Sequence, residues 1–108
     1  MVKTEREIKE IISRYAVELE KLGITSQRIV LYGSYAKGMP REDSDIDLIV
    51  ISEHFEGMNI RERLELLGIA AGKVFEPIEA LGYTPEEIEA NKKGTFLEEI
   101  LEQIHINP

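Results

Sequence analysis

Two apolar runs separated by a short polar segment constrain the fold of this 108-residue chain more than any other feature. The first run, residues 28–32, leads directly into a Gly-Ser pair, and the second, residues 48–51, follows an Asp-Ile-Asp sequence. Short apolar runs bounded by turn residues are typical of buried β-strands. The pattern predicts two neighbouring strands, with a small-residue turn after the first and two carboxylates at the start of the second.

The two carboxylates, Asp45 and Asp47, are separated only by Ile46. Residues i and i+2 of a strand lie on the same face, so we expect the aspartates to project side by side while Ile46 turns into the core. Adjacent carboxylates repel each other and raise each other's pKa unless a cation neutralises them. Proteins hold Mg²⁺ through one or two carboxylates together with substrate phosphates, so the pair predicts a magnesium site.

The turn before this pair carries groups that suit a phosphate. Gly33 allows backbone N–H groups to approach a ligand closely, and Ser34 adds a hydroxyl donor. Lys37 and Arg41 lie in the connection, where they either reach phosphate oxygens or remain solvated loop charges. A phosphate cradle and a metal-binding pair joined by one connection indicate nucleotidyl or phosphoryl transfer.

The arrangement of Gly33-Ser34, ten intervening residues and Asp45-x-Asp47 resembles the signature of the DNA polymerase β-type nucleotidyltransferase superfamily. Within that group, the short length and acidic balance resemble the minimal nucleotidyltransferases, the MNT-type antitoxins that are paired with HEPN-type ribonuclease toxins. The resemblance implies an α/β (α+β) fold, with a small mixed β-sheet of three to four strands covered by helices. The length leaves room for a single domain, residues 1–108.

The resemblance also implies a reaction, the transfer of AMP from ATP to a hydroxyl with release of pyrophosphate. Asp45 and Asp47 would hold two Mg²⁺ ions, while the Gly33 N–H and Ser34 would hold the β- and γ-phosphates. ATP is the donor that the family suggests. For the antitoxin relatives, the acceptor is a tyrosine on the toxin partner, which is silenced by the modification.

A third carboxylate is expected on the third strand, where the minimal nucleotidyltransferases commonly carry an Asp shortly before a Thr-Pro-Glu-Glu helix start. The matching position is Glu79, which would bind the metal nearest the acceptor and help take up its proton. The longer side chain leaves open that Glu79 is only a solvated edge-strand residue. Glu76 is a competing candidate, and it faces the other way if the strand is regular.

The charge balance bears on the partner. The net charge is −8, and the lysines and arginines are scattered among glutamates rather than gathered in a basic stripe. This disfavours a polynucleotide acceptor and favours a basic protein partner. The alternatives are a decayed domain that neutralises its toxin by binding alone, and a small-molecule nucleotidyltransferase. The oligomeric state, as a homo- or hetero-oligomer, stays open.

The remaining composition indicates a cytoplasmic protein. The chain has no cysteine, and no apolar run approaches the length needed to span a bilayer. The N-terminus reads as a charged helix rather than a signal peptide. The two histidines, His54 and His105, have no partner at metal-ligand spacing, so both are interpreted as structural or surface residues.

The other expected elements follow from periodicity and end signals. Helices are predicted at residues 4–22, with a capping box of Thr4 and Glu7, and at about residues 60–72, capped by Asn59 with Glu62. The predicted inner residues of the second helix are Ile60, Leu64, Leu67 and Ala71. The other predictions are a turn or short helix at 35–38, a loop at 52–57, a third strand at 74–81 limited to an edge or bulge by Pro77, and helices starting at Thr84 and Thr95.

Overall fold

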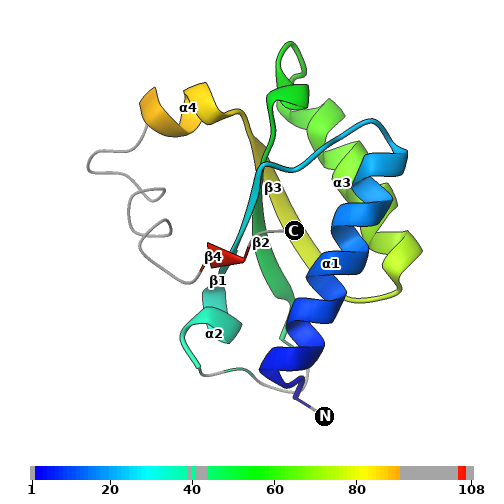
Figure 1. The fold of residues 1–108 in the computed structure, drawn as a ribbon, viewed down its shortest axis with the longest axis vertical. Helices are drawn as coiled ribbons and strands as arrows, with labels where there is room; N and C mark the ends of the chain where they lie inside the picture. Colours follow the sequence, from blue (N-terminus) through cyan, green and yellow to red (C-terminus); the bar gives the residue numbers. More distant parts are fainter. Residues whose placement is uncertain (1, 39, 41–43, 91–104, 107–108) are drawn as a thin grey trace.

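The computed structural model describes residues 2–38, 40, 44–90 and 105–106 (Figure 1). In chain order the elements are α1 (Glu5–Lys21), β1 (Arg28–Tyr32), α2 (Gly33–Ala36), β2 (Ile46–Ile51), the 3-10 helix η1 (Glu53–Phe55), α3 (Ile60–Val74), β3 (Ile78–Tyr83), α4 (Pro85–Ala90) and β4 (His105–Ile106). The helix predicted from Thr95 lies outside the described residues. No helix in the described ranges combines the length and apolarity needed to cross a bilayer.

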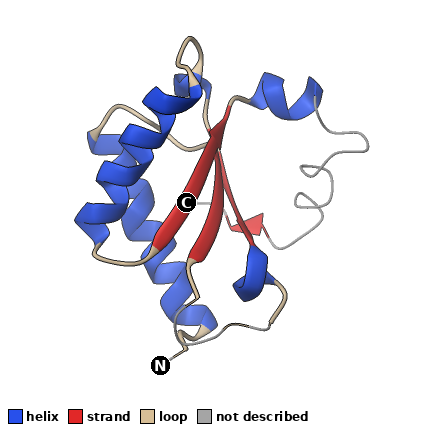
Figure 2. Cartoon of the chain, turned by 180° about the vertical axis from the view of Figure 1, so that it is seen from behind, coloured by secondary structure: helices blue, strands red, loops and turns tan. Residues whose placement is uncertain are grey.

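The strands form one mixed sheet in the order β3-β2-β1-β4. β1 is antiparallel to both β2 and β4, whereas β2 and β3 are parallel. Helices α1 and α3 lie together on one face of this sheet (Figure 2). The predicted small mixed sheet covered by helices is confirmed, and so is the edge position of the strand that follows Pro77.

The main core lies between the sheet and the two long helices. Thr4 and Glu7 form the predicted capping box, and the apolar side of α1 is buried from Ile8 to Leu19. Tyr15 is fully buried in this layer and donates a hydrogen bond of 2.9 Å to the Leu67 carbonyl oxygen of α3. Burial raises the pKa of the Tyr15 phenol, since the charged form would lose its hydration.

Helix α3 differs from the prediction in which side it buries. Ile60 is 75% exposed and Leu64 is 45% exposed, although both were expected to face inward. The buried positions are Arg63, Leu67, Ala70 and Val74. Leu67 is thus confirmed as an inner residue, and the partly buried Ala71 packs against the same core. An arginine can occupy an inner position because its guanidinium is fully engaged there, as described below.

The third strand begins later than predicted. Residue 74 still belongs to α3, and Phe75 ends that helix in the left-handed conformation, with φ of 60°. Pro77 cannot supply a ladder N–H, so the strand starts only at Ile78. The predicted loop at 52–57 contains η1, capped by Ser52 and anchored by the buried Phe55.

His54 has the structural role that was predicted for it. Its Nδ1 accepts a hydrogen bond of 3.0 Å from the Thr25 N–H, which ties η1 to the loop before β1. The Ser52 hydroxyl reinforces the same junction by donating to the Thr25 carbonyl oxygen at 2.7 Å.

Candidate functional site

Three polar residues stand in a row across the sheet. Asp47 of β2 is paired in register with Tyr32 of β1 on one side and with Glu79 of β3 on the other. Directly paired residues project from the same face of a sheet. The neighbours Ile46 and Leu48 point into the core beneath α1 and α3, so the row faces the opposite side.

Gly33 brings the turn after β1 against Asp47. Its φ of +75° lies in the region that favours glycine, and a Cβ placed there would lie 3.0 Å from Cγ of Asp47 and still closer to Oδ2. Any larger residue would have to displace the carboxylate. Gly33, which the sequence predicts to be part of a phosphate cradle, therefore also leaves the space that the Asp47 carboxylate occupies beside the turn.

Helix α2 starts earlier than predicted, at Gly33 rather than Tyr35. Gly33 and Ser34 therefore form its first turn, whose N–H groups have no acceptor within the helix. The Lys37 N–H donates to the Gly33 carbonyl oxygen at 3.1 Å at the end of α2, and the residue is exposed. Arg41, the other predicted phosphate ligand, lies outside the described residues.

The row is strongly acidic in character. Partial burial raises the pKa of Asp47, and the negative charges of Glu79 and Asp45 raise it further. Burial also raises the pKa of Tyr32, with Asp47 and Glu79 adding to the effect. Asp45 is exposed and directly precedes β2, which leaves it close enough for its charge to act on Asp47. The three predicted carboxylates are thus brought into one neighbourhood.

This donor set fits a hard cation that is completed by its substrate. Carboxylate oxygens are what Mg²⁺ prefers, and a cation would relieve the repulsion that raises the pKa of Asp47. Within the described part of the chain, no three acidic or histidine side chains converge into a ready-made metal cage. A site on Asp45, Asp47 and Glu79 therefore needs further oxygens, such as those of a phosphate seated at Gly33.

Glu76 is placed elsewhere. It precedes β3 and its carboxylate pairs with Lys3 at 3.2 Å and with Arg14 of α1 at 3.7 Å. Its charge is therefore balanced by the helix layer, on the side of the sheet away from the row. Of the two candidate third carboxylates, only Glu79 lies beside Asp47.

Sequence reasoning missed Tyr32 as a member of the row. Its position directly before Gly33 was visible, but its pairing with Asp47 depends on the register between β1 and β2. No local pattern in the sequence encodes that register by itself, whereas alternation along β1 could have placed Tyr32 on the same face as Val30.

Comparison with known proteins adds the family. Residues 6–104 match the family model described as "Nucleotidyltransferase domain". The chain belongs to this nucleotidyltransferase family. It is 38% identical over 66 residues to "Putative protein adenylyltransferase MJ0126" of Methanocaldococcus jannaschii, a match covering 60% of this chain and 63% of that protein's length.

Two solved structures are similar to this nucleotidyltransferase-family chain. One is the "putative nucleotidyltransferase from Sulfolobus solfataricus", at a TM-score of 0.63 and 13% identity over 91% of this chain and 78% of that one, a likeness of fold. The other belongs to a crystal structure of "the toxin-antitoxin with AMP-PNP", at a TM-score of 0.49 and 25% identity over 68% of this chain and 56% of that one.

Proposed function

We propose that this chain transfers AMP from ATP to a tyrosine hydroxyl of a partner HEPN-type toxin and so acts as the antitoxin of the pair. The observation that supports this most is the position of Asp47, with the Gly33 turn on one side and Glu79 on the other. A phosphate donor and a hydroxyl acceptor can thereby meet at one carboxylate. The name of the M. jannaschii relative supports a protein as the acceptor.

Each residue of the site has a role in this proposal. Asp45 and Asp47 would hold Mg²⁺, with two ions as the family resemblance implies, and the first-turn N–H groups at Gly33 and Ser34 donate to the β- and γ-phosphates. Lys37, at the end of α2, and Arg41, which lies outside the described residues, are proposed as further ligands of the phosphates. When bound, Mg²⁺ would supply neutralisation of the charge on the attacking and leaving oxygens.

The chemical step forms one bond and breaks one. The tyrosine oxygen attacks the α-phosphorus of ATP, the new O–P bond forms, and the bond from the α-phosphorus to the bridging oxygen breaks to release pyrophosphate. The phenolic proton passes to the carboxylate of Glu79. Glu79 suits this role because it is exposed on an edge strand, where an incoming hydroxyl can reach it.

The decisive experiment is a transfer assay with α-labelled ATP, Mg²⁺ and the purified product of the neighbouring gene. We expect label to appear on that partner, to be lost with Asp45→Asn, and to map to a tyrosine. Glu86→Gln is the matched control, since Glu86 is an exposed acid in the first turn of α4, away from the row.

Other outcomes separate the rival functions. A tight complex that neutralises the toxin without any label transfer would overturn the enzymatic proposal in favour of a binding antitoxin. Label transferred to a small aminoglycoside-like acceptor, and not to the partner, would favour a small-molecule nucleotidyltransferase.

A further inference from the structure

A groove runs along the outer edge of β3 and starts at the carboxylate row. It consists of two adjoining pockets, of about 340 Å³ and about 230 Å³, which share Leu64 and Leu81 in their linings. The first pocket includes Tyr32 and Glu79, whereas the second ends at Arg63. The groove therefore leads from the proposed acceptor carboxylate along the strand. We call it the β3 groove.

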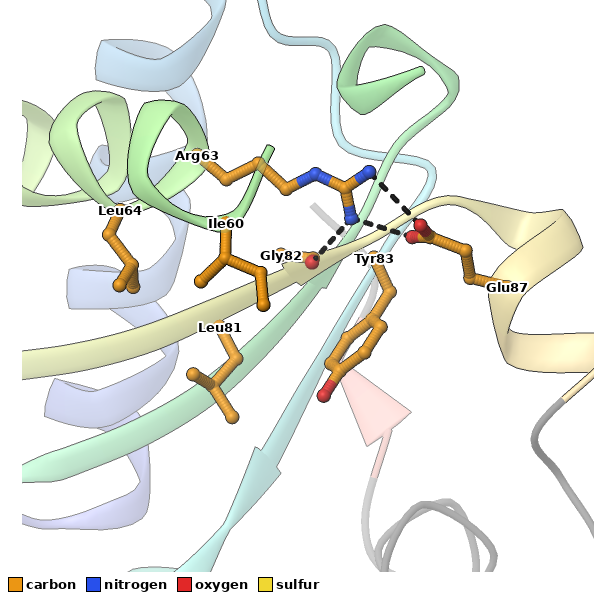
Figure 3. Close-up of a pocket in the computed structure, with 7 residues that line it drawn as sticks. All are labelled: Ile60, Arg63, Leu64, Leu81, Gly82, Tyr83 and Glu87. Carbon is orange, nitrogen blue, oxygen red and sulfur yellow. Dashed lines mark hydrogen bonds and ion pairs between the residues drawn. The ribbon is translucent and has the colours of Figure 1, made fainter. Parts of the chain in front are cut away.

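The walls of the β3 groove are apolar and exposed. Figure 3 shows Ile60 and Leu64 reaching from α3 toward β3, while Leu81 and Tyr83 project on the other side of the strand. Ile60 and Leu64 are among the most exposed large apolar residues of the described chain, at 75% and 45%. Contact with another apolar surface would remove these side chains from water, which is favourable in free energy.

The floor of the groove is the edge of a strand. The Ile46 N–H donates to the Pro77 carbonyl oxygen at 2.8 Å, and the Ser52 N–H donates to the Tyr83 carbonyl oxygen at 2.9 Å, so odd-numbered residues direct their backbone groups toward β2. By alternation, the backbone groups of Ala80 face outward. β3 has no strand neighbour on that side among the described residues.

Arg63 closes the far end of this edge. Its guanidinium donates to the Gly82 carbonyl oxygen at 3.1 Å and forms two hydrogen bonds with the Glu87 carboxylate, at 2.6 and 3.0 Å (Figure 3). An added strand could therefore pair at Ala80, next to Glu79, but not beyond it. The groove offers no unpaired charge at its closed end.

We propose that the β3 groove binds an extended segment of the acceptor polypeptide, paired with the edge of β3, so that its tyrosine lies beside Glu79. This inference rests on the proposed function. The donor phosphates would lie at Gly33, on the β1 side of Asp47, which leaves the β3 side for the acceptor. Strand addition supplies main-chain hydrogen bonds between the segment and β3. The residues that line the groove contact every second side chain of the segment and so determine which sequences fit.

The length of the groove specifies the segment further. From Glu79 to Leu81 a strand advances about 7 Å, at about 3.3 Å per residue. The segment therefore carries an apolar residue two positions from its tyrosine, on the same face, packed where Leu64 and Leu81 line both pockets. Because the chain has a net charge of −8, basic residues flank the segment.

The test uses two synthetic peptides with lysine flanks and one tyrosine, of which the first carries leucine two positions away and the second carries serine there. Each is titrated into the ¹⁵N-labelled full chain, and each is offered as acceptor with labelled ATP and Mg²⁺. We expect amide shifts centred on Leu64 and Ala80, with the leucine peptide binding at least about five-fold more tightly.

Leu64→Glu and Ile69→Glu form a matched pair of variants on α3, since Leu64 and Ile69 are 45% and 49% exposed and Ile69 lies outside the groove. We expect Leu64→Glu to weaken peptide binding at least ten-fold without changing ATP affinity, and Ile69→Glu to leave both unchanged. Equal effects of the two variants on peptide affinity, or amide shifts located away from β3, would overturn the proposal that the β3 groove binds the acceptor segment. Groove-specific binding without label transfer to any protein would instead overturn the proposed function alone.

Discussion

The two ends of β3 place carboxylates in opposite electrostatic surroundings. At its beginning, Asp47 and Glu79 lie beside each other with Asp45 nearby, and burial together with these like charges raises the pKa of Asp47. Beyond its end, Glu87 accepts two hydrogen bonds from Arg63, which lower the pKa of the Glu87 carboxyl. Glu87 is therefore neutralised by a cation of the chain itself, whereas no ion pair between the described residues involves Asp45, Asp47 or Glu79.

The cluster around Arg63 and Glu87 has a structural role, whereas we propose a functional one for the cluster of carboxylates at the beginning of β3. Arg63 also donates to the carbonyl oxygens of Met58, Gly82 and Phe55, so it joins α3, β3 and η1 around one guanidinium. Such a fully satisfied cluster contributes stability. A cluster of like charges costs stability, and it is of use only when a ligand supplies the missing positive charge.

The largest effect is expected from Asp47→Asn, which leaves the acidic row without its central charge. We expect label transfer to fall by about three orders of magnitude, equivalent to about 4 kcal/mol of transition-state stabilisation. In the presence of EDTA, urea unfolding should show a stability equal to or above that of the wild type, because a repulsion has been removed. An active variant, or an unstable one, would contradict the functional interpretation of this end of β3.

The second largest effect is expected from Arg63→Ala, which removes the guanidinium at the centre of the hydrogen-bonded cluster beyond the end of β3. Removing a buried cation leaves Glu87 and three carbonyl oxygens without their donor, so we expect a loss of about 3 kcal/mol in the free energy of unfolding. Arg61→Ala is the control on the same helix, since the Arg61 side chain is 89% exposed and forms its ion pair with the exposed Glu65. A loss as small as that of the control would show that the cluster does not stabilise the fold.

A smaller effect is expected from Gly33→Ala, which presses a methyl group against Asp47. We expect a loss of about 2 kcal/mol in the free energy of unfolding and a reduced affinity for ATP in the presence of Mg²⁺. Gly38→Ala carries a similar strain, at φ of +71°, but a Cβ there has no atom within 4 Å. The difference between the two variants measures the contact with Asp47, and equal effects would argue against that contact.

The smallest effect is expected from Glu87→Gln, which keeps the capping hydrogen bond to the Thr84 N–H but removes the charge. The pKa of the Glu87 carboxyl is lower in the folded state than its ordinary value of 4.5. The ionised group therefore stabilises the fold at pH values above 4.5, and this contribution is lost as the pH falls through the folded pKa. We expect a loss of about 1 kcal/mol at pH 7, discounted for the 39% exposure of Glu87, that disappears in acid. A loss independent of pH would contradict the ion pair.

The sequence was sufficient wherever a signal is local. The capping boxes of Thr4 with Glu7 and of Asn59 with Glu62 span one helical turn each, and both are confirmed. The start of β3 was predicted four residues too early, because the left-handed Phe75 that ends α3 is not a residue that normally marks such an ending.

The non-local parts of the site could not be predicted in the same way. The grouping of Asp45 with Asp47 follows from their spacing, whereas the pairing of Asp47 with Tyr32 and Glu79 depends on the register of three strands. The inward position of Arg63 depends on partners in η1, β3 and α4, which no helical period reveals. The catalytic role of Glu79 stays a prediction.

Calorimetric titration of ATP into the wild-type chain, with Mg²⁺ and then with EDTA, tests most directly whether Asp45, Asp47 and Glu79 form a cation-dependent nucleotide site. We predict saturable binding with Mg²⁺, at least a ten-fold weaker affinity with EDTA, and for Asp47→Asn a weak affinity that Mg²⁺ does not increase. Equal affinity with and without Mg²⁺, or unchanged binding to Asp47→Asn, would contradict the account.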